Sequence, residues 1–334
     1  MKNNRPKIAL LLGGSSSERE VSKSSGFSIY NALKTLDYET VLIDPAYGKN
    51  QPKEPEAFFD KKDFAEVSTR NYLEAINSPL FDSIDLAFLG LHGKWGEDGT
   101  IQSLLEVRGV HYTGSNVMAS AVAMDKAMSK IIFQHFSIST PRWFMVEKRN
   151  FDPEKVKKNI DEKFGYPCVI KPNDEGSTVG LTICKNAGEV DRGLEFSFKF
   201  SDRILIEDYI EGRELTVAIL DNKALPVLEI KPKHGLYDYE CKYTKGMSEY
   251  FVPADIPADV AKALQKDSLE AFNALGCSVY CRLDYMMTRD NNFYCLEANT
   301  LPGMTSTSLV PKMAKAVGIS FEELIDRIIK LSLR

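Results

Sequence analysis

The sequence predicts an α/β N-terminal part followed by two α+β parts, and three observations support this fold class. Apolar strand patterns alternate with helix patterns near the N-terminus, a small mixed unit follows, and strand patterns dominate from residue 214 on. The chain has 334 residues. At roughly 150 residues per domain, this length favours two or three domains.

The N-terminal part contains apolar runs that predict buried strands at residues 7–12, 39–43 and 84–91. Gly13, Gly14 and three serines follow the first run, and the next helix is expected to bury Val21, Ser25, Ile29 and Leu33. A further helix is predicted to begin near Thr100. This order of strand, helix and strand indicates a parallel sheet with covering helices. Gly114 and Ser115 close the first predicted domain, residues 1–115.

The middle part, residues 116–206, is predicted to be a small α+β unit. Its first helix is expected to bury Met124, Met128, Ile131 and Ile132. Strands are predicted at 141–146, 166–171, 179–184 and 203–207, with a helix at 187–198. The last part, residues 207–334, carries predicted strands at 214–220, 225–231, 278–288 and 293–298. Residues 232–253 show no clear period, and a loop of this length indicates either a functional lid or a misassigned element.

The composition is that of an ordinary globular protein, with 43% apolar residues, 27% charged residues and a net charge of −5. This charge provides no basic field for nucleic acid, and no apolar run reaches the ~20 residues of a membrane span. The apolar run at residues 8–12 is too short for a signal peptide, so we expect a cytoplasmic protein. Six cysteines without a CxxC pair and only four histidines favour reduced thiols over a zinc site.

Two carboxylates and an amide lie on a hairpin predicted over residues 279–298. A two-residue loop would place Asp284 opposite Glu297, or opposite Asn299 if the loop is shifted by one residue. Because side chains alternate with period 2, both registers put these residues on one face, together with Arg282. A three-residue loop without a bulge would break the arrangement.

This polar face has two interpretations. Carboxylates roughly 5 Å apart across two strands repel each other unless positive charge lies between them. Arg282 could supply that charge as an ion-pair partner. Alternatively, oxygen atoms from Asp284, Glu297 and Asn299 suit a hard cation such as Mg²⁺, which fills its other positions with phosphate oxygens and water. The residues alone leave both interpretations open.

Glycine-rich segments suggest a site for an anionic ligand. Residues 92–99 (HGKWGEDG) follow a predicted strand, where α/β proteins bind ligands, although this segment alone slightly favours an ordinary turn. Neither GxGxxG nor GxxxxGK[ST] is present, so a dinucleotide fold and a P-loop are not supported. Residues 171–180 (KPNDEGSTVG) could cover a phosphate chain, with Lys171 and backbone N–H groups as donors. Lys126 and Lys242 are further candidate phosphate ligands.

Eight segments carry a resemblance that spans nearly the whole chain: GGSSSEREVS (13–22), HGKWGEDG (92–99), MDK (124–126), KPNDEGSTVG (171–180), IEGRELTVAIL (210–220), YDYECKY (237–243), CRLDYM (281–286) and LEANTLPGMTSTSL (296–309). In this order they resemble the D-alanine:D-alanine ligases of the ATP-grasp superfamily. The resemblance implies a Rossmann-like N-terminal domain, a small central domain, and a C-terminal mixed-sheet domain that grips ATP against the central one.

The resemblance implies a two-step ligation for peptidoglycan synthesis. ATP phosphorylates the carboxylate of one D-alanine, and the amine of a second D-alanine attacks the acyl phosphate. Mg²⁺ or Mn²⁺, as two ions, and a homodimer are also implied. The family's metal ligands correspond to Asp284, Glu297 and Asn299. In the family the metal ions bridge the ATP phosphates and neutralise charge on the transferring phosphoryl group.

Other positions match the family's ATP contacts. The phosphate-binding lysines correspond to Lys126, Lys171 and Lys242. The adenine-binding hinge corresponds to Glu207, Asp208, Tyr209 and Ile210, and the ribose carboxylate to Glu214. For the substrates, the resemblance implies that Glu18 holds the first ammonium group and that His92 lies near the first substrate.

The remaining matches concern the reacting groups. Arg282 and the backbone N–H of Gly303 match an oxyanion site for the tetrahedral intermediate, and Ser308 matches a contact to the second substrate's carboxylate. Ser177 and Tyr243 would complete a hydrogen-bonded chain with Glu18.

Two positions depart from the family pattern, since Thr307 stands where many members have histidine and Trp95 is bulky within its motif. A related ligase that uses D-lactate or another amino acid is the alternative, although the resemblance links Tyr243 to D-alanine. A nucleotide-binding protein without catalysis would predict a damaged metal or oxyanion set, which is not found. A nicotinamide dehydrogenase would require the missing glycine fingerprint.

Overall fold

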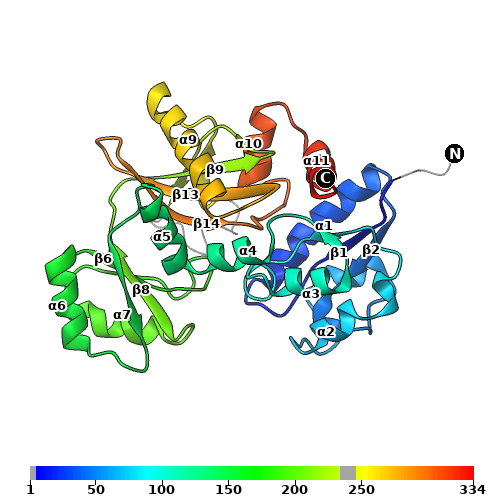
Figure 1. The fold of residues 1–334 in the computed structure, drawn as a ribbon, viewed down its shortest axis with the longest axis horizontal. Coiled ribbons are helices and arrows are strands. Elements are labelled where there is room, and N and C mark those ends of the chain that lie inside the picture. The colour runs from blue at the N-terminus through cyan, green and yellow to red at the C-terminus, as the bar shows by residue number, and fades with distance from the viewer. Residues whose placement is uncertain (1–4, 234–245) are drawn as a thin grey trace.

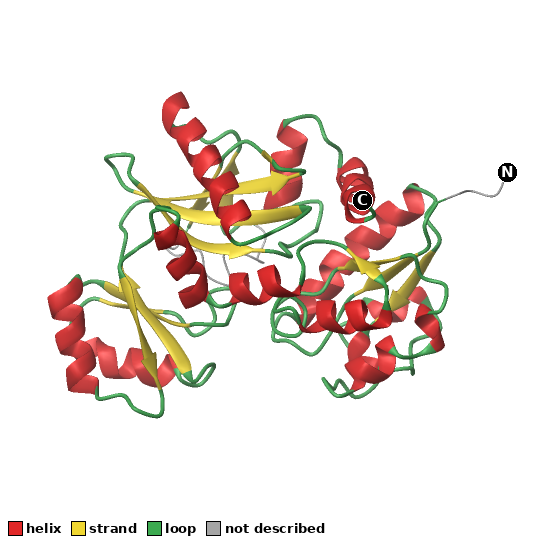
Figure 2. Ribbon diagram, in the orientation of Figure 1, coloured by secondary structure: helices red, strands yellow, loops and turns green. Residues whose placement is uncertain are grey.

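The computed structural model describes residues 5–233 and 246–334, which form three sheets covered by helices. In Figure 1 the N-terminal sheet lies at the right, the middle sheet at the lower left, and the third sheet above and between them. Figure 2 shows the strands of the three sheets in yellow and the helices packed around them in red. No helix in these two ranges is both long and apolar enough to cross a membrane.

The N-terminal sheet is parallel, as the sequence predicts. Its strand order is β2 (Thr40–Ile43), β1 (Ile8–Leu11), β3 (Leu86–Leu89) and β4 (His111–Tyr112). Every residue of β1 and β3 is buried, because helices cover both faces of a parallel sheet. The covering elements are α1 (Arg19–Thr35), α2 (Asn71–Ile76), α3 (Thr100–Arg108) and the 3₁₀ turns η1 (Pro45–Tyr47), η2 (Pro55–Phe58) and η3 (Pro79–Phe81).

The middle sheet is antiparallel and has its own apolar core. Its strand order is β5 (Trp143–Glu147), β8 (Arg203–Asp208), β6 (Cys168–Pro172) and β7 (Thr182–Cys184). The helices α6 (Pro153–Lys163) and α7 (Val190–Ser197), with the 3₁₀ turn η4 (Ala187–Glu189), pack on this sheet. The predicted strand at 179–184 is therefore shorter than expected, because residues 176–181 form a turn-rich loop.

The third sheet has the order β12 (Ser248–Phe251), β11 (Leu228–Pro232), β9 (Arg213–Leu220), β13 (Tyr280–Met287) and β14 (Phe293–Asn299), and β10 (Lys223–Ala224) pairs with β9. Helix α9 (Ala258–Ala274) covers one face, and apolar residues of α4 (Val117–Met124) and α5 (Lys126–His135) join the same core. The C-terminal helices α10 (Leu309–Ala316) and α11 (Phe321–Ser332) instead share a core with the N-terminal sheet.

Helix α5 corrects one prediction about its buried face. Met128 and Ile131, which the sequence predicts to be inside, are 42% and 49% exposed. Lys126 and Lys130 are buried instead, and Phe133 supplies the apolar contact. The apolar period misled because two lysines on this helix point inward to carboxylates, as described below.

Candidate active site

Two neighbouring cavities open where the three sheets meet. The first lies between the middle and third sheets and is lined by Lys126, Lys171, Glu207, Asp208, Tyr209, Ile210, Glu214, Asp284 and Glu297. The second lies between the third sheet and the N-terminal domain and is lined by Glu18, His92, Ser177, Arg282, Glu297, Asn299, Gly303, Thr307 and Ser308. Glu297 lines both cavities, so its carboxylate stands at their junction.

The first cavity rests on a buried cluster of charge. Glu207 on β8 lies between two lysines: its Oε1 is 2.5 Å from Lys171 Nζ and its Oε2 is 2.9 Å from Lys130 Nζ. Lys130 Nζ also donates to Thr140 Oγ1 at 2.6 Å. Burial alone would raise the pKa of Glu207, but the two ammonium groups bring it below its usual value. The cluster carries a net positive charge beside the cavity, which suits a polyanionic ligand.

Lys130 was missed by sequence reasoning. A signal existed, because Lys126 and Lys130 are four residues apart and so share one face of α5. Lys126 Nζ lies 3.3 Å from Glu297 Oε2 and donates to the carbonyl of Glu175 at 2.6 Å. The two lysines of α5 therefore contact Glu297 and Glu207, two of the carboxylates that line the first cavity.

The hairpin of β13 and β14 places Asp284 opposite Glu297 and Arg282 opposite Asn299. It reaches this register by a route that the sequence did not predict. Thr288 N–H donates to the carbonyl of Asn292, so the loop has three residues, and a bulge between β13 and β14 then shifts the pairing by one. The bulge restores the common face that a three-residue loop alone would have destroyed.

The ion pair of the first interpretation is present on this polar face, and the metal of the second stays a prediction. Arg282 donates to Asp284 twice, from Nε at 2.9 Å and from Nη2 at 2.7 Å, and Thr216 Oγ1 donates to the same carboxylate at 2.7 Å. Asn299 Oδ1, in contrast, is buried and has no hydrogen-bond partner within the described part of the chain. Carboxylate and amide oxygens of this kind fit a hard divalent cation.

Glu18 enters the second cavity from the N-terminal domain. It stands just before α1, but its carboxylate does not cap that helix. Ser177 Oγ donates to Glu18 Oε1 instead, across the boundary between the N-terminal and middle units. Ser177 and Thr178 have φ values of 50° and 64°, a left-handed conformation that costs about 1–3 kcal/mol per residue. Such strain is typical of a loop whose shape is set by its ligand contacts.

Two glycines allow the close approach of this loop. A Cβ atom at Gly93 would lie 2.8 Å from Glu18 Oε2, and one at Gly176 would lie 3.0 Å from the same oxygen. Lys94, next to Gly93, forms an ion pair with Glu175 at 2.7 Å. The HGKWGEDG segment and the KPNDEGSTVG loop are therefore joined directly, a connection that sequence reasoning did not predict. Within the first segment Trp95 has a φ of 70°, and nothing in the structure explains its bulk.

His92 lies in the second cavity with both ring nitrogens engaged. Its Nδ1 is 2.9 Å from the carbonyl oxygen of Leu301, and its Nε2 is 2.8 Å from Ser25 Oγ. Burial lowers the pKa of His92, but the neighbouring Glu97 carboxylate outweighs this and raises it. His92 therefore connects the N-terminal domain to the loop that carries Gly303.

The rest of the predicted set is distributed as follows. Ser308 precedes α10 and its Oγ accepts from the backbone N–H of Thr305 at 3.1 Å, so the loop after Gly303 is folded back at the cavity wall. Thr307 lines the same wall. Lys242 and Tyr243 lie outside the described residues, as does most of the predicted lid at 232–253.

Known proteins match this chain along almost its full length. Family models described as "D-ala D-ala ligase N-terminus" and "D-ala D-ala ligase C-terminus" match residues 7–115 and 132–330. A D-alanine–D-alanine ligase from Syntrophotalea carbinolica is 42% identical over 97% of this chain and 95% of its own length. One from Halalkalibacterium halodurans is 42% identical over 98% of this chain and 99% of its own length.

Solved structures agree with these matches. The D-alanine–D-alanine ligase of Bacillus anthracis superposes with a TM-score of 0.78 at 36% identity, covering 99% of this chain and 98% of its own. The same enzyme complexed with ATP superposes with a TM-score of 0.77 at 35% identity and the same coverage. The VanG D-Ala:D-Ser ligase of Enterococcus faecalis gives 0.83 at 30% identity, covering 98% and 100%. With its ATP-grasp fold, the chain belongs to the D-alanine–D-alanine ligase family.

Proposed function

We propose that this protein joins two D-alanines to D-alanyl-D-alanine, with ATP as the phosphoryl donor, to supply a peptidoglycan precursor. The observation that carries the proposal is the pair of cavities that meet at Glu297. One cavity has Lys126, Lys171 and the hinge segment, which suit ATP, and the other has the polar lining that suits two small amino acids. The ATP-complexed ligase of Bacillus anthracis supports the assignment of the first cavity.

The first step is phosphorylation of a carboxylate. A carboxylate oxygen of the first D-alanine attacks the γ-phosphorus of ATP, and ADP leaves with the bond electrons. Glu18 holds the ammonium group of this D-alanine. The hydrogen bond from Ser177 fixes the position of the Glu18 carboxylate. Lys126 and Lys171, with Lys242 outside the described residues, bind phosphate oxygens. The hinge Glu207–Ile210 and Glu214 bind the nucleoside.

We further propose two divalent ions, Mg²⁺ or Mn²⁺, held by Asp284, Glu297 and Asn299. The unpartnered oxygen of Asn299 supports this donor set. When bound, the metal would supply positive charge that stabilises the transferring phosphoryl group. Arg282 fixes Asp284 from the same face, so the ion pair and the metal site share one carboxylate.

The second step forms the peptide bond. The amine of the second D-alanine attacks the acyl carbon, and phosphate leaves as the carbon–oxygen bond breaks. Arg282 and the N–H of Gly303 stabilise the oxyanion of the tetrahedral intermediate, a contribution often worth about 3 kcal/mol. Ser308 binds the carboxylate of the second D-alanine, and Tyr243 extends the polar chain of Ser177 and Glu18.

Three broader properties belong to the same proposal. The chain works as three units, residues 1–115, 116–206 and 207–334, although α4 and α5 pack in the core of the third sheet. It forms a homodimer, supported by the exposed apolar side chains of Val107 and Met118. It acts in the cytoplasm, supported by the free thiols of the described cysteines.

A phosphate-release assay tests the function. The protein is incubated with ATP, Mg²⁺ and a panel of D-alanine, L-alanine, D-serine and D-lactate. We expect phosphate release when D-alanine is the single added substrate and no release when L-alanine is. Release only with a different amino acid or hydroxy acid would overturn the substrate assignment.

A further inference from the structure

The segment of residues 44–72, which runs from the end of β2 into the start of α2, contacts the loop that carries Glu18. Gly14 N–H donates to Asp44 Oδ1 at 3.0 Å, and Ser15 N–H donates to Tyr72 Oη at 3.0 Å. Ser15 Oγ also lies 3.0 Å from Thr69 Oγ1. Three side chains from this segment therefore fix the loop of residues 13–18 from outside.

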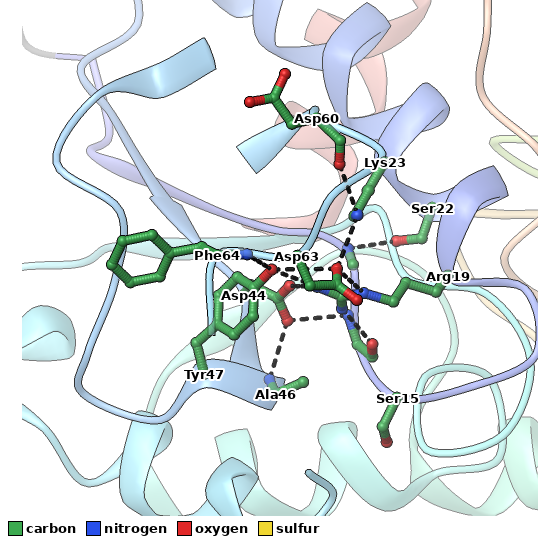
Figure 3. A network of polar contacts seen from close by, with 12 residues as sticks. Ser15, Arg19, Ser22, Lys23, Asp44, Ala46, Tyr47, Asp60, Asp63 and Phe64 are labelled. Atoms are coloured by element: carbon green, nitrogen blue, oxygen red, sulfur yellow. Dashed lines mark hydrogen bonds and ion pairs between the residues drawn. The ribbon is translucent and has the colours of Figure 1, made fainter. Parts of the chain in front are cut away.

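Arg19 is the central residue of this contact, as Figure 3 shows. Its guanidinium lies 2.7 Å from Asp44 Oδ2 and 2.9 Å from Asp63 Oδ1, and it donates to Tyr47 Oη at 2.8 Å. A further N–H of Arg19 donates to the carbonyl of Gly14. Arg19 directly follows Glu18, so these contacts restrain the backbone from which the Glu18 side chain extends.

Lys23, one helical turn after Arg19, completes the network. Its Nζ lies 2.9 Å from Asp63 Oδ1 and donates to the carbonyl of Asp60 at 2.7 Å. Burial raises the pKa of Asp63, but Lys23 and Arg19 outweigh it and lower the pKa below its usual value. Asp63 thus stays charged at neutral pH and joins the segment to two cations at the start of α1.

The loop geometry requires this support. Gly13 and Gly14 have φ values of 77° and 74°, which glycine adopts readily because it has no Cβ atom. For the same reason these two residues do not stiffen the chain. A Cβ at Gly13 would lie 2.2 Å from Asp44 Oδ2, so glycine is needed for the carboxylate to approach. Hydrogen bonds compensate for the flexibility of the two glycines: Gly14 N–H donates to Asp44, Ser15 N–H donates to Tyr72, and Arg19 donates to the carbonyl of Gly14.

We propose that residues 44–72 act as a positioning clamp, which sets the Glu18 carboxylate at the first-substrate site through Arg19. The inference rests on the proposed ligase function and deepens it. Arg19 and Asp63 are positioning residues, since they line neither cavity. Loosening the clamp should weaken binding of the first D-alanine while ATP binding, which uses the other cavity, stays unchanged.

The test isolates the first step with hydroxylamine as the nucleophile. The acyl phosphate reacts with hydroxylamine to give D-alanyl hydroxamate and phosphate, so the second D-alanine is not needed. Asp63 is 39% exposed by side chain, so Asp63→Asn should fold. We expect it to raise KM for D-alanine roughly tenfold, because charge-assisted bonds to Arg19 and Lys23 are lost. KM for ATP should change less than about twofold.

Matched variants separate positioning from general damage. Asp82→Asn removes the ion-pair partner of Arg108 in the same domain. The side chain of Asp82 is 65% exposed and lies away from Glu18, so this variant should change neither the KM for D-alanine nor the KM for ATP. Asp63→Glu, which keeps the charge, should recover most of the lost affinity, and Tyr47→Phe should repeat the defect in milder form. An unchanged KM for D-alanine in Asp63→Asn, or an equal rise in both KM values, would overturn the clamp. A wild-type protein that forms no hydroxamate would instead contradict the ligase function on which the clamp rests.

Discussion

Removal of Lys130 should cost much less stability than neutralisation of Glu207, although the two form one ion pair. Lys130 has no exposed side-chain area, and its pKa is lowered because burial disfavours its charge. Lys130→Met removes this desolvated ammonium and leaves Glu207 paired with Lys171 at 2.5 Å. Breaking a buried pair costs about 3–5 kcal/mol when the remaining charge has no partner. Since a partner remains here, we expect a loss of about 1–2 kcal/mol.

Glu207→Gln has the opposite consequence. It leaves the ammonium groups of Lys130 and Lys171 without their shared counter-charge, so the full cost of about 3–5 kcal/mol applies. Equilibrium unfolding in guanidinium chloride measures the loss in free energy of unfolding for each of the two variants, taken from the first unfolding transition. Far-UV circular dichroism shows that each variant folds. A Lys130→Met loss equal to or larger than that of Glu207→Gln would refute the reasoning. Nucleotide bound at the adjacent cavity should narrow the difference, because phosphate replaces the lost negative charge.

Three other changes have expected outcomes. Glu297→Gln should lower turnover by about 100-fold or more through lost neutralisation of the phosphoryl charge, and a near-normal rate at saturating Mg²⁺ would disprove the metal assignment. Burial raises the pKa of Asp267 to about 6, so the charged carboxylate lowers the stability of the fold once the pH has risen through that value. Asp267→Asn should therefore stabilise the protein by about 1–2 kcal/mol at pH 7.5 and have no effect at pH 4. Thermal unfolding at the two pH values measures this difference. Tyr243→Phe, outside the described residues, should shift kcat/KM from D-alanine towards D-lactate as the second substrate, by a few kcal/mol at most, whereas an unchanged ratio would leave Tyr243 with a packing role only.

Much of the fold could be predicted because the apolar periods are local. The strands β1 and β3 are continuous apolar runs, and Val21, Ser25, Ile29 and Leu33 are all buried on α1, as their spacing predicts. Helix α5 was mispredicted because ion pairs, which leave no trace in an apolar period, turn Lys126 and Lys130 inward.

The candidate site was predictable to the level of residue types but not of contacts. The alternation of strands put Asp284 and Glu297 on one face, yet the pairing depends on a bulge that no local signal in the sequence indicated. The Asp63–Arg19 contact joins residues 44 positions apart, so composition alone could only predict a polar surface. Long-range contacts of this kind are decided by tertiary packing, which a single sequence does not report.

The central claim is that the first D-alanine reacts through an acyl phosphate. D-Alanine labelled with ¹⁸O in its carboxylate, ATP and Mg²⁺ are incubated with the protein, and mass spectrometry follows both products. One carboxylate oxygen should leave with the γ-phosphoryl group, so each D-alanyl-D-alanine formed should be matched by one phosphate that carries a single ¹⁸O. Dipeptide formed with unlabelled phosphate would contradict the acyl phosphate, and phosphate release without dipeptide would contradict the ligation itself.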